Sequence, residues 1–194
     1  MARRRPQAYP RGMHIIPLPD PGRILLAVTP YISGDIIFDL AARLALAGGL
    51  EVLDGGNTFN AYRAARALRG MDARALHALQ GARLARAFTC YQVAALLEEM
   101  AAAPRPTLPL LVLDFLATFG DQSVALRERR RLLSLCLARL EQIAAQRRLG
   151  IWVRRRSVAP LETLEFLARL EHAAGTVWRM EQVGTPAPIQ GRLF

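Results

Sequence analysis

The chain has 194 residues, 52% of them hydrophobic, a length that favours one sizeable core over two. No apolar run approaches the roughly 20 residues that a membrane-spanning helix needs, so we expect a soluble, cytoplasmic protein without a membrane partner. The formal net charge is +10 and every one of the 26 basic residues is arginine. Such a charge indicates a polyanionic or acidic partner, although a GC-rich genome or growth at high temperature also raises arginine. Because lysine is absent, phosphate-loop, Schiff-base and general-base lysines are excluded.

Residues 1–22 are basic and rich in proline, and we predict that they form an exposed arm. Prolines interrupt this segment where a secretory signal would have its apolar core. Residues 23–183 are the predicted core domain, and 184–194 a C-terminal tail. Cys90 and Cys136 lie in apolar helical patterns without metal-type spacing, so neither a disulfide framework nor a zinc site is expected. The three histidines are far apart, and no catalytic or metal-binding residue is predicted.

The core alternates short apolar runs with longer helical patterns. In chain order the first half is predicted as strand 24–28, helix 35–49, strand 50–54, helices 61–70 and 72–84, and strand 85–88. The second half continues as helix 90–103, strand 108–114, a loop over 115–123, helix 124–149, strand 150–153, helix 160–175 and strand 176–183. This alternation is typical of an α/β fold with a mostly parallel sheet covered by helices on both faces.

The loop between the first strand and the first helix has the place of a phosphate-binding loop. A working loop holds phosphates with backbone N–H groups, a lysine and a hydroxyl residue on Mg²⁺. Here Asp35 stands in the lysine position and Ile36 in the hydroxyl position. At an effective dielectric near 20, two charges about 4 Å apart interact by roughly 4 kcal/mol, so a carboxylate there would repel a phosphate strongly. The degenerate loop consists of Thr29, Pro30, Ser33, Gly34, Asp35 and Ile36.

Asp35 also stands at the start of a predicted helix, where a negative charge favours the helix dipole. We therefore predict that its carboxylate occupies the place of the missing anion. Asp114 ends the most strand-like run of the chain, in the position of a magnesium-orienting (Walker B) acid. A structural role in capping the next loop explains Asp114 equally well.

Three segments in order resemble the core ATPase domain of RecA-like proteins, above all the archaeal and eukaryotic strand-exchange recombinases and their paralogues. They are LEVLDGGNTFNAYRAARAL, ARAFTCYQVAALLEEM and the long segment from LLVLDFLATFGDQS to LGIWV. The similarity covers about residues 22–153. It implies a RecA-like, P-loop-type, three-layer α/β/α fold.

The departures from this family fall on its nucleotide chemistry. The family's water-activating glutamate is matched by Gly56, and its loop lysine and threonine are matched by Asp35 and Ile36. The resemblance therefore implies a pseudo-ATPase in DNA recombination or repair, and we expect neither ATP nor Mg²⁺ to bind.

In the recombinases, the loops after the strands that end near Asp114 and Val153 face DNA. Arginine suits phosphate because its planar fork donates two hydrogen bonds. The predicted nucleic-acid contacts are Arg127, Arg130, Arg131, Arg154, Arg155 and Arg156, with Arg3, Arg4 and Arg5 of the arm. A solvated helix face explains the 127–131 cluster equally well, since Glu128 lies within it.

Three functions remain open. The first is a non-hydrolysing recombinase paralogue that binds DNA, a RecA-like partner or both. The second is a divergent ATPase in which an arginine or a neighbouring subunit replaces the lysine. The third is a scaffold that assembles with copies of itself or with an active paralogue, without binding nucleic acid.

Overall fold

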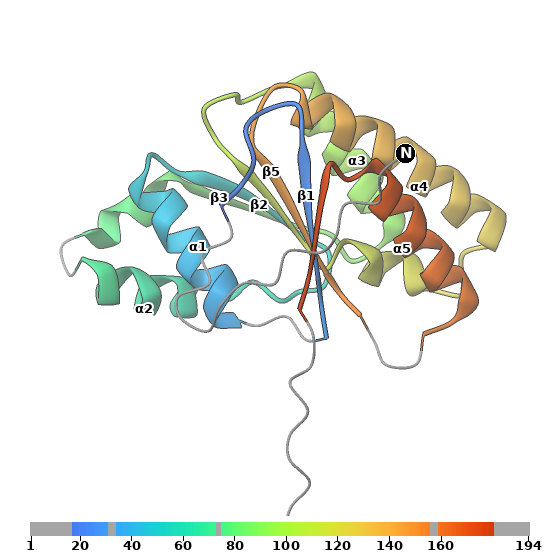
Figure 1. The fold of residues 1–194 in the computed structure, drawn as a ribbon, viewed down its shortest axis with the longest axis horizontal. Helices are drawn as coiled ribbons and strands as arrows, with labels where there is room; N and C mark the ends of the chain where they lie inside the picture. The colour runs from blue at the N-terminus through green and yellow to red at the C-terminus, as the bar shows by residue number, and fades with distance from the viewer. Residues whose placement is uncertain (1–16, 31–33, 73–74, 156–158, 181–194) are drawn as a thin grey trace, which may run out of the picture.

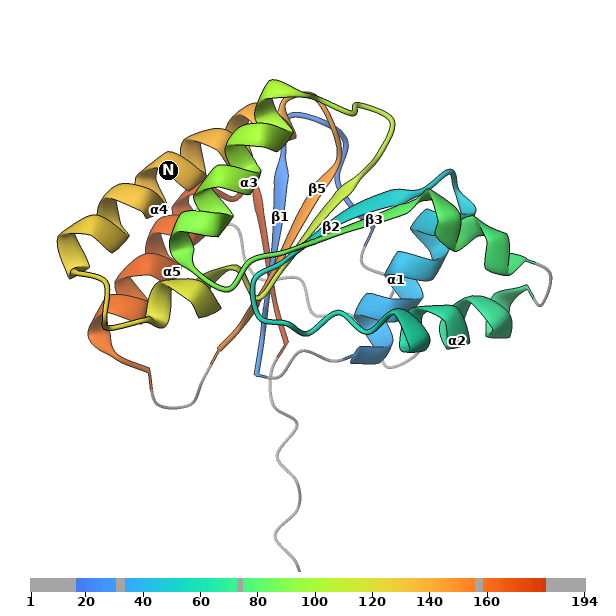
Figure 2. The ribbon, with the colours of Figure 1, turned by 180° about the vertical axis from the view of Figure 1, so that it is seen from behind.

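The computed structural model describes residues 17–30, 34–72, 75–155 and 159–180, and the side chains of 34, 35, 75 and 76 lie outside this description. It is a three-layer α/β/α structure, with the sheet between two sets of helices (Figure 1). The helices α1 (Gly34–Leu46) and α2 (Ala61–Met71) cover one face. The helices α3 (Cys90–Ala102), α4 (Leu126–Ala144) and α5 (Leu161–Ala173) cover the other, where α3 packs beside α4 (Figure 2).

The sheet is six-stranded and entirely parallel, in the order β3-β2-β4-β5-β1-β6. Its strands are β1 (Ile24–Thr29), β2 (Leu50–Asp54), β3 (Ala82–Arg86), β4 (Leu110–Leu113), β5 (Leu149–Arg154) and β6 (Thr176–Arg179). From β1 to β3 the chain moves toward one edge of the sheet, through α1 and α2. From β3 to β6 it moves toward the opposite edge, through α3, α4 and α5. Because crossovers between parallel strands are right-handed, this reversal of direction places helices on both faces.

Burial explains why the central strands have continuous apolar sequences. Every residue of β1, β2 and β4 is buried, as expected for parallel strands covered on both faces. One core cluster lies beneath α3, α4 and α5 and contains Phe115, Phe119 and Phe166. A second lies beneath α1 and α2 and contains Trp152. Leu18, from the predicted arm, is buried in this second cluster.

These observations confirm the predicted fold class, and the sheet is all parallel where we expected mostly parallel. Several local predictions were wrong. The predicted helix 124–149 ends at Ala144, and Leu149 belongs to β5. Residues 82–84 do not continue a helix. They begin β3, because they pair in register with β2 from Leu50 to Val52. The predicted loop 115–123 contains the 3₁₀ helix η2 (Phe115–Gly120), whose two phenylalanines are buried. A second 3₁₀ helix, η1 (Ala75–Gly81), replaces most of the predicted helix 72–84.

Among the described residues, no helix combines the length and hydropathy that crossing a membrane requires.

Candidate functional site at the carboxyl edge of the sheet

The carboxyl ends of the parallel strands meet at one edge, which we call the carboxyl edge. Thr29 at the end of β1 lies beside Arg154 at the end of β5, and Asp54 at the end of β2 lies beside Leu113 of β4. Ligands of open parallel α/β sheets bind outside this edge. The residues that follow these strands are therefore the first candidates for a functional site.

The degenerate phosphate loop is described only in part. Thr29 is buried, and its hydroxyl has no hydrogen-bond partner among the described residues. Gly34 and Asp35 form the first turn of α1, and Ile36 packs partly against the core beneath that helix. Ser33 and the side chain of Asp35 lie outside the described part. The predicted contact of the Asp35 carboxylate with backbone N–H groups stays a prediction.

Asp114 is held in an unusual backbone conformation directly after β4. Its φ of 49° and ψ of 43° are left-handed, a region that aspartate tolerates better than most residues. Its N–H donates to the Trp152 carbonyl at 2.7 Å, and its carbonyl accepts from the N–H of Ala117 at 2.9 Å. The backbone of Asp114 thus ties β5 to the start of η2.

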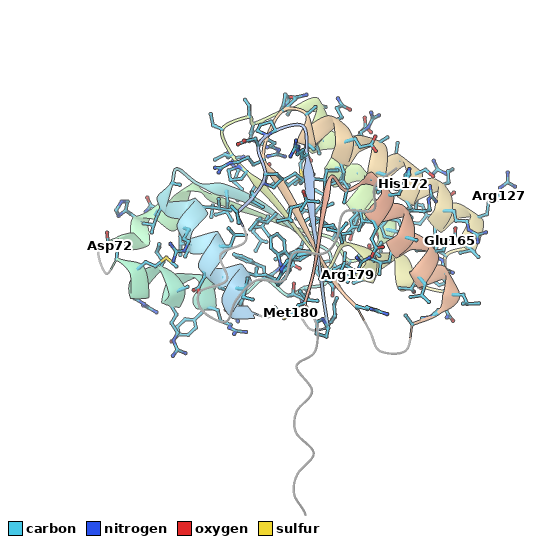
Figure 3. All side chains as sticks on the ribbon, viewed as in Figure 1. Asp72, Arg127, Glu165, His172, Arg179 and Met180 are labelled. Carbon is cyan, nitrogen blue, oxygen red and sulfur yellow. The ribbon has the colours of Figure 1, made fainter. Side chains whose placement is uncertain are left out.

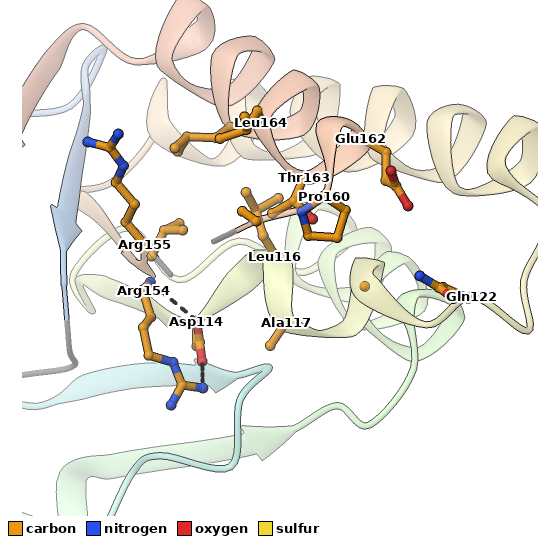
Figure 4. Close-up of a pocket in the computed structure, with 14 residues that line it drawn as sticks. Asp114, Leu116, Ala117, Gln122, Arg154, Arg155, Pro160, Glu162, Thr163 and Leu164 are labelled. Carbon is orange, nitrogen blue, oxygen red and sulfur yellow. Dashed lines mark hydrogen bonds and ion pairs between the residues drawn. The ribbon is translucent and has the colours of Figure 1, made fainter. Parts of the chain in front are cut away.

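The Asp114 carboxylate is paired with an arginine of the neighbouring strand (Figure 4). The Nη2 of Arg154 donates to Oδ2 at 2.6 Å, and the backbone N–H of Arg154 donates to Oδ1 at 3.3 Å. The aspartate side chain is 4% exposed and that of the arginine 38%. A guanidinium therefore neutralises the carboxylate that the resemblance assigns to orienting a metal ion.

Gly56 lies against the same carboxylate. A Cβ atom at this position would stand 2.5 Å from both the Cβ and the Oδ2 of Asp114. Such a distance is far below van der Waals contact, so any side chain here must displace Asp114. The glutamate that the family has at this position does not fit the observed arrangement.

Asp54 has a local structural role. Its Oδ1 accepts from the N–H and the hydroxyl of Thr58 at 2.9 and 3.2 Å, and its Oδ2 accepts from the N–H of Phe59 at 2.8 Å. The Nε of Arg86 lies 3.7 Å from Oδ2. These contacts fix the loop that leads from β2 to α2 and satisfy a fully buried carboxylate.

The arginines predicted to contact nucleic acid divide into paired and unpaired groups. Arg130 binds Glu165 through two nitrogens and holds the pKa of that carboxyl below its usual value, and Arg131 does the same to Glu128. Within the described ranges, Arg127 and Arg155 have exposed side chains without a hydrogen bond or ion pair. Figure 3 shows Arg127 at the outer end of α4, pointing away from the molecule.

Of the other predicted contacts, Arg154 is held by Asp114 as described above. The remaining four, Arg3, Arg4, Arg5 and Arg156, lie outside the described residues.

A cavity of about 200 Å³ opens at this edge between β5, η2 and α5, and we call it the η2–α5 pocket (Figure 4). Its apolar walls come from η2, from the end of β5 and from the first turns of α5. Polar and charged groups line the cavity as well. The apolar lining residues include Leu116, Ala117, Val153, Leu164 and Leu167, and the polar and charged ones are Asp114, Gln122, Arg154, Arg155, Glu162 and Thr163.

Sequence reasoning missed the pairing of Arg154 with Asp114 and the pocket beside it. The two residues are 40 positions apart, and only the adjacency of β4 and β5 brings them together. The available signal was that each residue ends or follows an apolar strand. Strand order, which the sequence did not specify, was needed to make them neighbours.

The described residues contain no group of three or more His, Cys, Asp and Glu side chains suited to a metal ion. Comparison with known proteins identifies no relative: no family model matches the chain, and no curated protein is significantly similar to it.

Proposed function

We propose that this protein is a non-hydrolysing RecA-like recombinase paralogue that binds DNA, a RecA-like partner or both, through the carboxyl edge of its sheet. The ion pair between Asp114 and Arg154 is the observation that carries the proposal. In this pair the guanidinium of Arg154 binds the carboxylate that would otherwise orient a magnesium ion. The fold is consistent with the RecA-like architecture that the resemblance implies.

Loss of hydrolysis is supported by two features of the site around Asp114. The Asp114 carboxylate already has a positively charged partner, and breaking that pair would leave a buried charge uncompensated. Gly56 stands where a water-activating glutamate would be needed, and it is packed against Asp114. A nucleotide would therefore meet no free metal-orienting acid and no general base at these two positions.

Polyanion binding is supported by the net charge and by where unpaired arginines lie. The chain carries +10, and Arg155 follows β5 directly at the carboxyl edge. Arginine contacts to phosphate position a protein on nucleic acid without reading its sequence. We expect binding that weakens steeply with salt, because each phosphate contact releases counterions.

Two titrations test the proposal. Calorimetry with Mg²⁺ and ATP should show no binding at micromolar nucleotide, and a Mg²⁺-dependent micromolar signal would support the divergent ATPase instead. Fluorescence anisotropy with labelled single- and double-stranded DNA, measured from 50 to 200 mM salt, should show salt-dependent binding. Absence of binding to both forms at 50 mM salt would refute the DNA part of the proposal.

A pair of arginines flanking β5 supplies a matched comparison. Arg155 follows the strand at the carboxyl edge, and Arg148 precedes it at the opposite edge with an exposed side chain. Arg155→Ala should lower the slope of log K against log salt by about 0.7 to 0.9, the value of one phosphate contact. Arg148→Ala removes the same charge and should leave the slope unchanged. Equal losses in both variants would indicate unspecific attraction rather than a site.

The scaffold function is favoured by a separate observation. In the described part of the chain, β3 pairs only with β2, and β6 pairs only with β1. Both strands thus present one unpaired edge, where another chain can add a strand. A stable complex that survives high salt and forms without DNA would support this function.

A further inference from the structure

The η2–α5 pocket is too small for a drug-sized molecule and large enough for one flat ring system. Its volume of about 200 Å³ is below the roughly 300–1,000 Å³ of pockets for such molecules. Leu116, Val153, Leu164 and Leu167 give it apolar walls from three different elements. A group that enters must therefore be compact and largely apolar on its faces.

Polar side chains also line the pocket. Gln122 and Thr163 carry groups that both donate and accept hydrogen bonds, so the pocket can satisfy donors and acceptors on a ligand. The ligand class that matches apolar walls with such polar groups among them is a heteroaromatic ring with polar atoms on its rim.

Of the cations that line the pocket, one has no partner in the part of the chain that the structure describes. Arg154 is neutralised by Asp114 at 2.6 Å, and Glu162 lies 3.9 Å from the guanidinium of Arg129. The Arg155 side chain is exposed and unpaired among the described residues. Figure 4 shows it across Leu116 and Leu164 from Glu162. The ligand is thus expected to carry an anionic group next to its ring.

We infer that the η2–α5 pocket holds one unstacked nucleobase of a single strand, with Arg155 bound to the adjoining phosphate. This inference rests on the proposed binding of DNA and names the form and the part of the nucleic acid that the carboxyl edge takes. A base within a duplex is paired and stacked, and extracting it costs a few kcal/mol, so single strands are preferred. Gln122 and Thr163 can pair with either hydrogen-bond donors or acceptors on a base. The pocket should therefore distinguish strongly between a strand with bases and a strand without them, and only weakly among different bases.

Abasic DNA separates the base from the phosphates. We would compare the full-length protein on a labelled oligothymidylate and on an oligonucleotide of equal length whose sugars carry no bases, by anisotropy at one salt concentration. Both strands have the same number of charges. The abasic strand should bind about tenfold more weakly, because it buries no base against the apolar walls of the pocket.

Filling the pocket should abolish this difference. Ala117 lines the pocket and is exposed, so Ala117→Trp places a large ring in the cavity with little effect on the core. The variant should bind both strands with the affinity that the wild type has for the abasic one. Ala102→Trp, at an exposed alanine near the end of α3, is the matched control and should keep the tenfold difference.

If Ala117→Trp fails to fold, Leu164→Trp at a 42% exposed position on α5 tests the same prediction. A second measurement uses one 2-aminopurine in the oligothymidylate, whose fluorescence should change on binding to the wild type and not to a filled variant. Equal binding of the two strands by the wild type would overturn the nucleobase pocket and leave DNA binding intact. Failure of both strands to bind would instead overturn the DNA part of the proposed function.

Discussion

Asp114, Arg154 and Gly56 are interdependent. The left-handed backbone of Asp114 turns its side chain toward the end of β5, where Arg154 supplies two donors. The carboxylate leaves no room for a Cβ atom at Gly56. Placing a glutamate at position 56 would therefore disturb Asp114 before it could activate a water, and this single substitution should not produce ATP hydrolysis.

Gly56→Ala should destabilise the protein by about 1–3 kcal/mol, the usual cost of overpacking, because its Cβ would overlap Asp114. Gly70→Ala is the control, since a Cβ atom at that position would have no atom within 4 Å and the residue is inside α2. That change should stabilise by about 0.5–1 kcal/mol. Urea denaturation of both variants measures the difference, and equal effects would contradict the close approach of Gly56 to Asp114.

The buried thiols give a pH dependence of known sign. Burial, with a smaller contribution from Cys90, raises the pKa of Cys136 to about 12. An unfolded cysteine ionises near 8.5, so between about pH 8.5 and 12 the unfolded chain has lost a proton that the folded protein keeps. Stability therefore falls with rising pH in this window, by about 1.4 kcal/mol per pH unit for one group.

Comparison of the wild type with Cys136→Ala isolates this effect. Between about pH 9 and 10.5, the free energy of unfolding of the variant should fall less steeply with pH than that of the wild type. The two slopes should differ by about 1.4 kcal/mol per pH unit, whatever the stability of the variant at neutral pH. Cys90, whose pKa burial also raises, remains in both proteins. Identical slopes would show that the Cys136 thiol ionises as easily in the folded state as in the unfolded one.

The contacts of single residues could be predicted from the sequence only in part, for a physical reason. Asp114 and Gly56 were selected because the resemblance aligns them with residues of the family's nucleotide chemistry, and their roles in that chemistry stay predictions. The contacts of Arg129 and Arg154 were not predicted, because each depends on a partner supplied by the fold. Arg129 is buried and donates to the carbonyls of Phe119 and Val124, which holds η2 against α4.

At the level of elements, a buried ionic cluster joins the amino end of the sheet to the end of α4. Arg147 is 2% exposed and donates to Glu51 of β2 at 2.6 Å and to the carbonyl of Leu108 at 3.3 Å. Arg105 reaches the other oxygen of the same carboxylate at 3.1 Å. Through the single acid Glu51, the cluster holds both the segment that leads into β4 and the segment that leads into β5.

Arg147→Met should cost about 3 kcal/mol, because Glu51 would keep only the partly exposed Arg105 as a partner. The adjacent Arg148 is exposed, and Arg148→Met should change stability by no more than about 0.5 kcal/mol. Chemical denaturation of the two variants tests this. Similar losses of stability in the two variants would mean that the buried ion pair stabilises the fold no more than an exposed arginine does.

The elements that were predicted correctly are those with long, strongly periodic or continuously apolar sequences, such as β1, β4 and the body of α4, whose predicted end at Leu149 lies five residues beyond the observed one. β3 was placed three residues late because Ala82, Arg83 and Leu84 are good helix formers, and their strand conformation comes from pairing with β2. η2 was missed because the burial of Phe115 and Phe119 depends on Phe166 of α5, 47 residues beyond Phe119.

For the whole molecule, the open edges of the sheet and its charge have opposite consequences. The net charge of +10 makes copies of the chain repel one another, whereas an unpaired edge strand attracts a further strand. Leu84 on β3 is 43% exposed and Phe88, just beyond the strand, is 68% exposed. Screening of charge by salt should therefore shift the balance toward assembly through this edge.

We expect concentration-dependent self-association that strengthens from 50 to 500 mM salt, whereas DNA binding weakens over the same range. Leu84→Arg places a charge on the β3 edge and should raise the dissociation constant about tenfold or more. Leu161→Arg adds the same charge at an 83% exposed position on α5, outside both edges, and should have little effect. Light scattering over a concentration series measures both. A wild-type protein that stays monomeric at 500 mM salt would show that the β3 edge is not an assembly surface, and it would leave the proposed binding at the carboxyl edge unaffected.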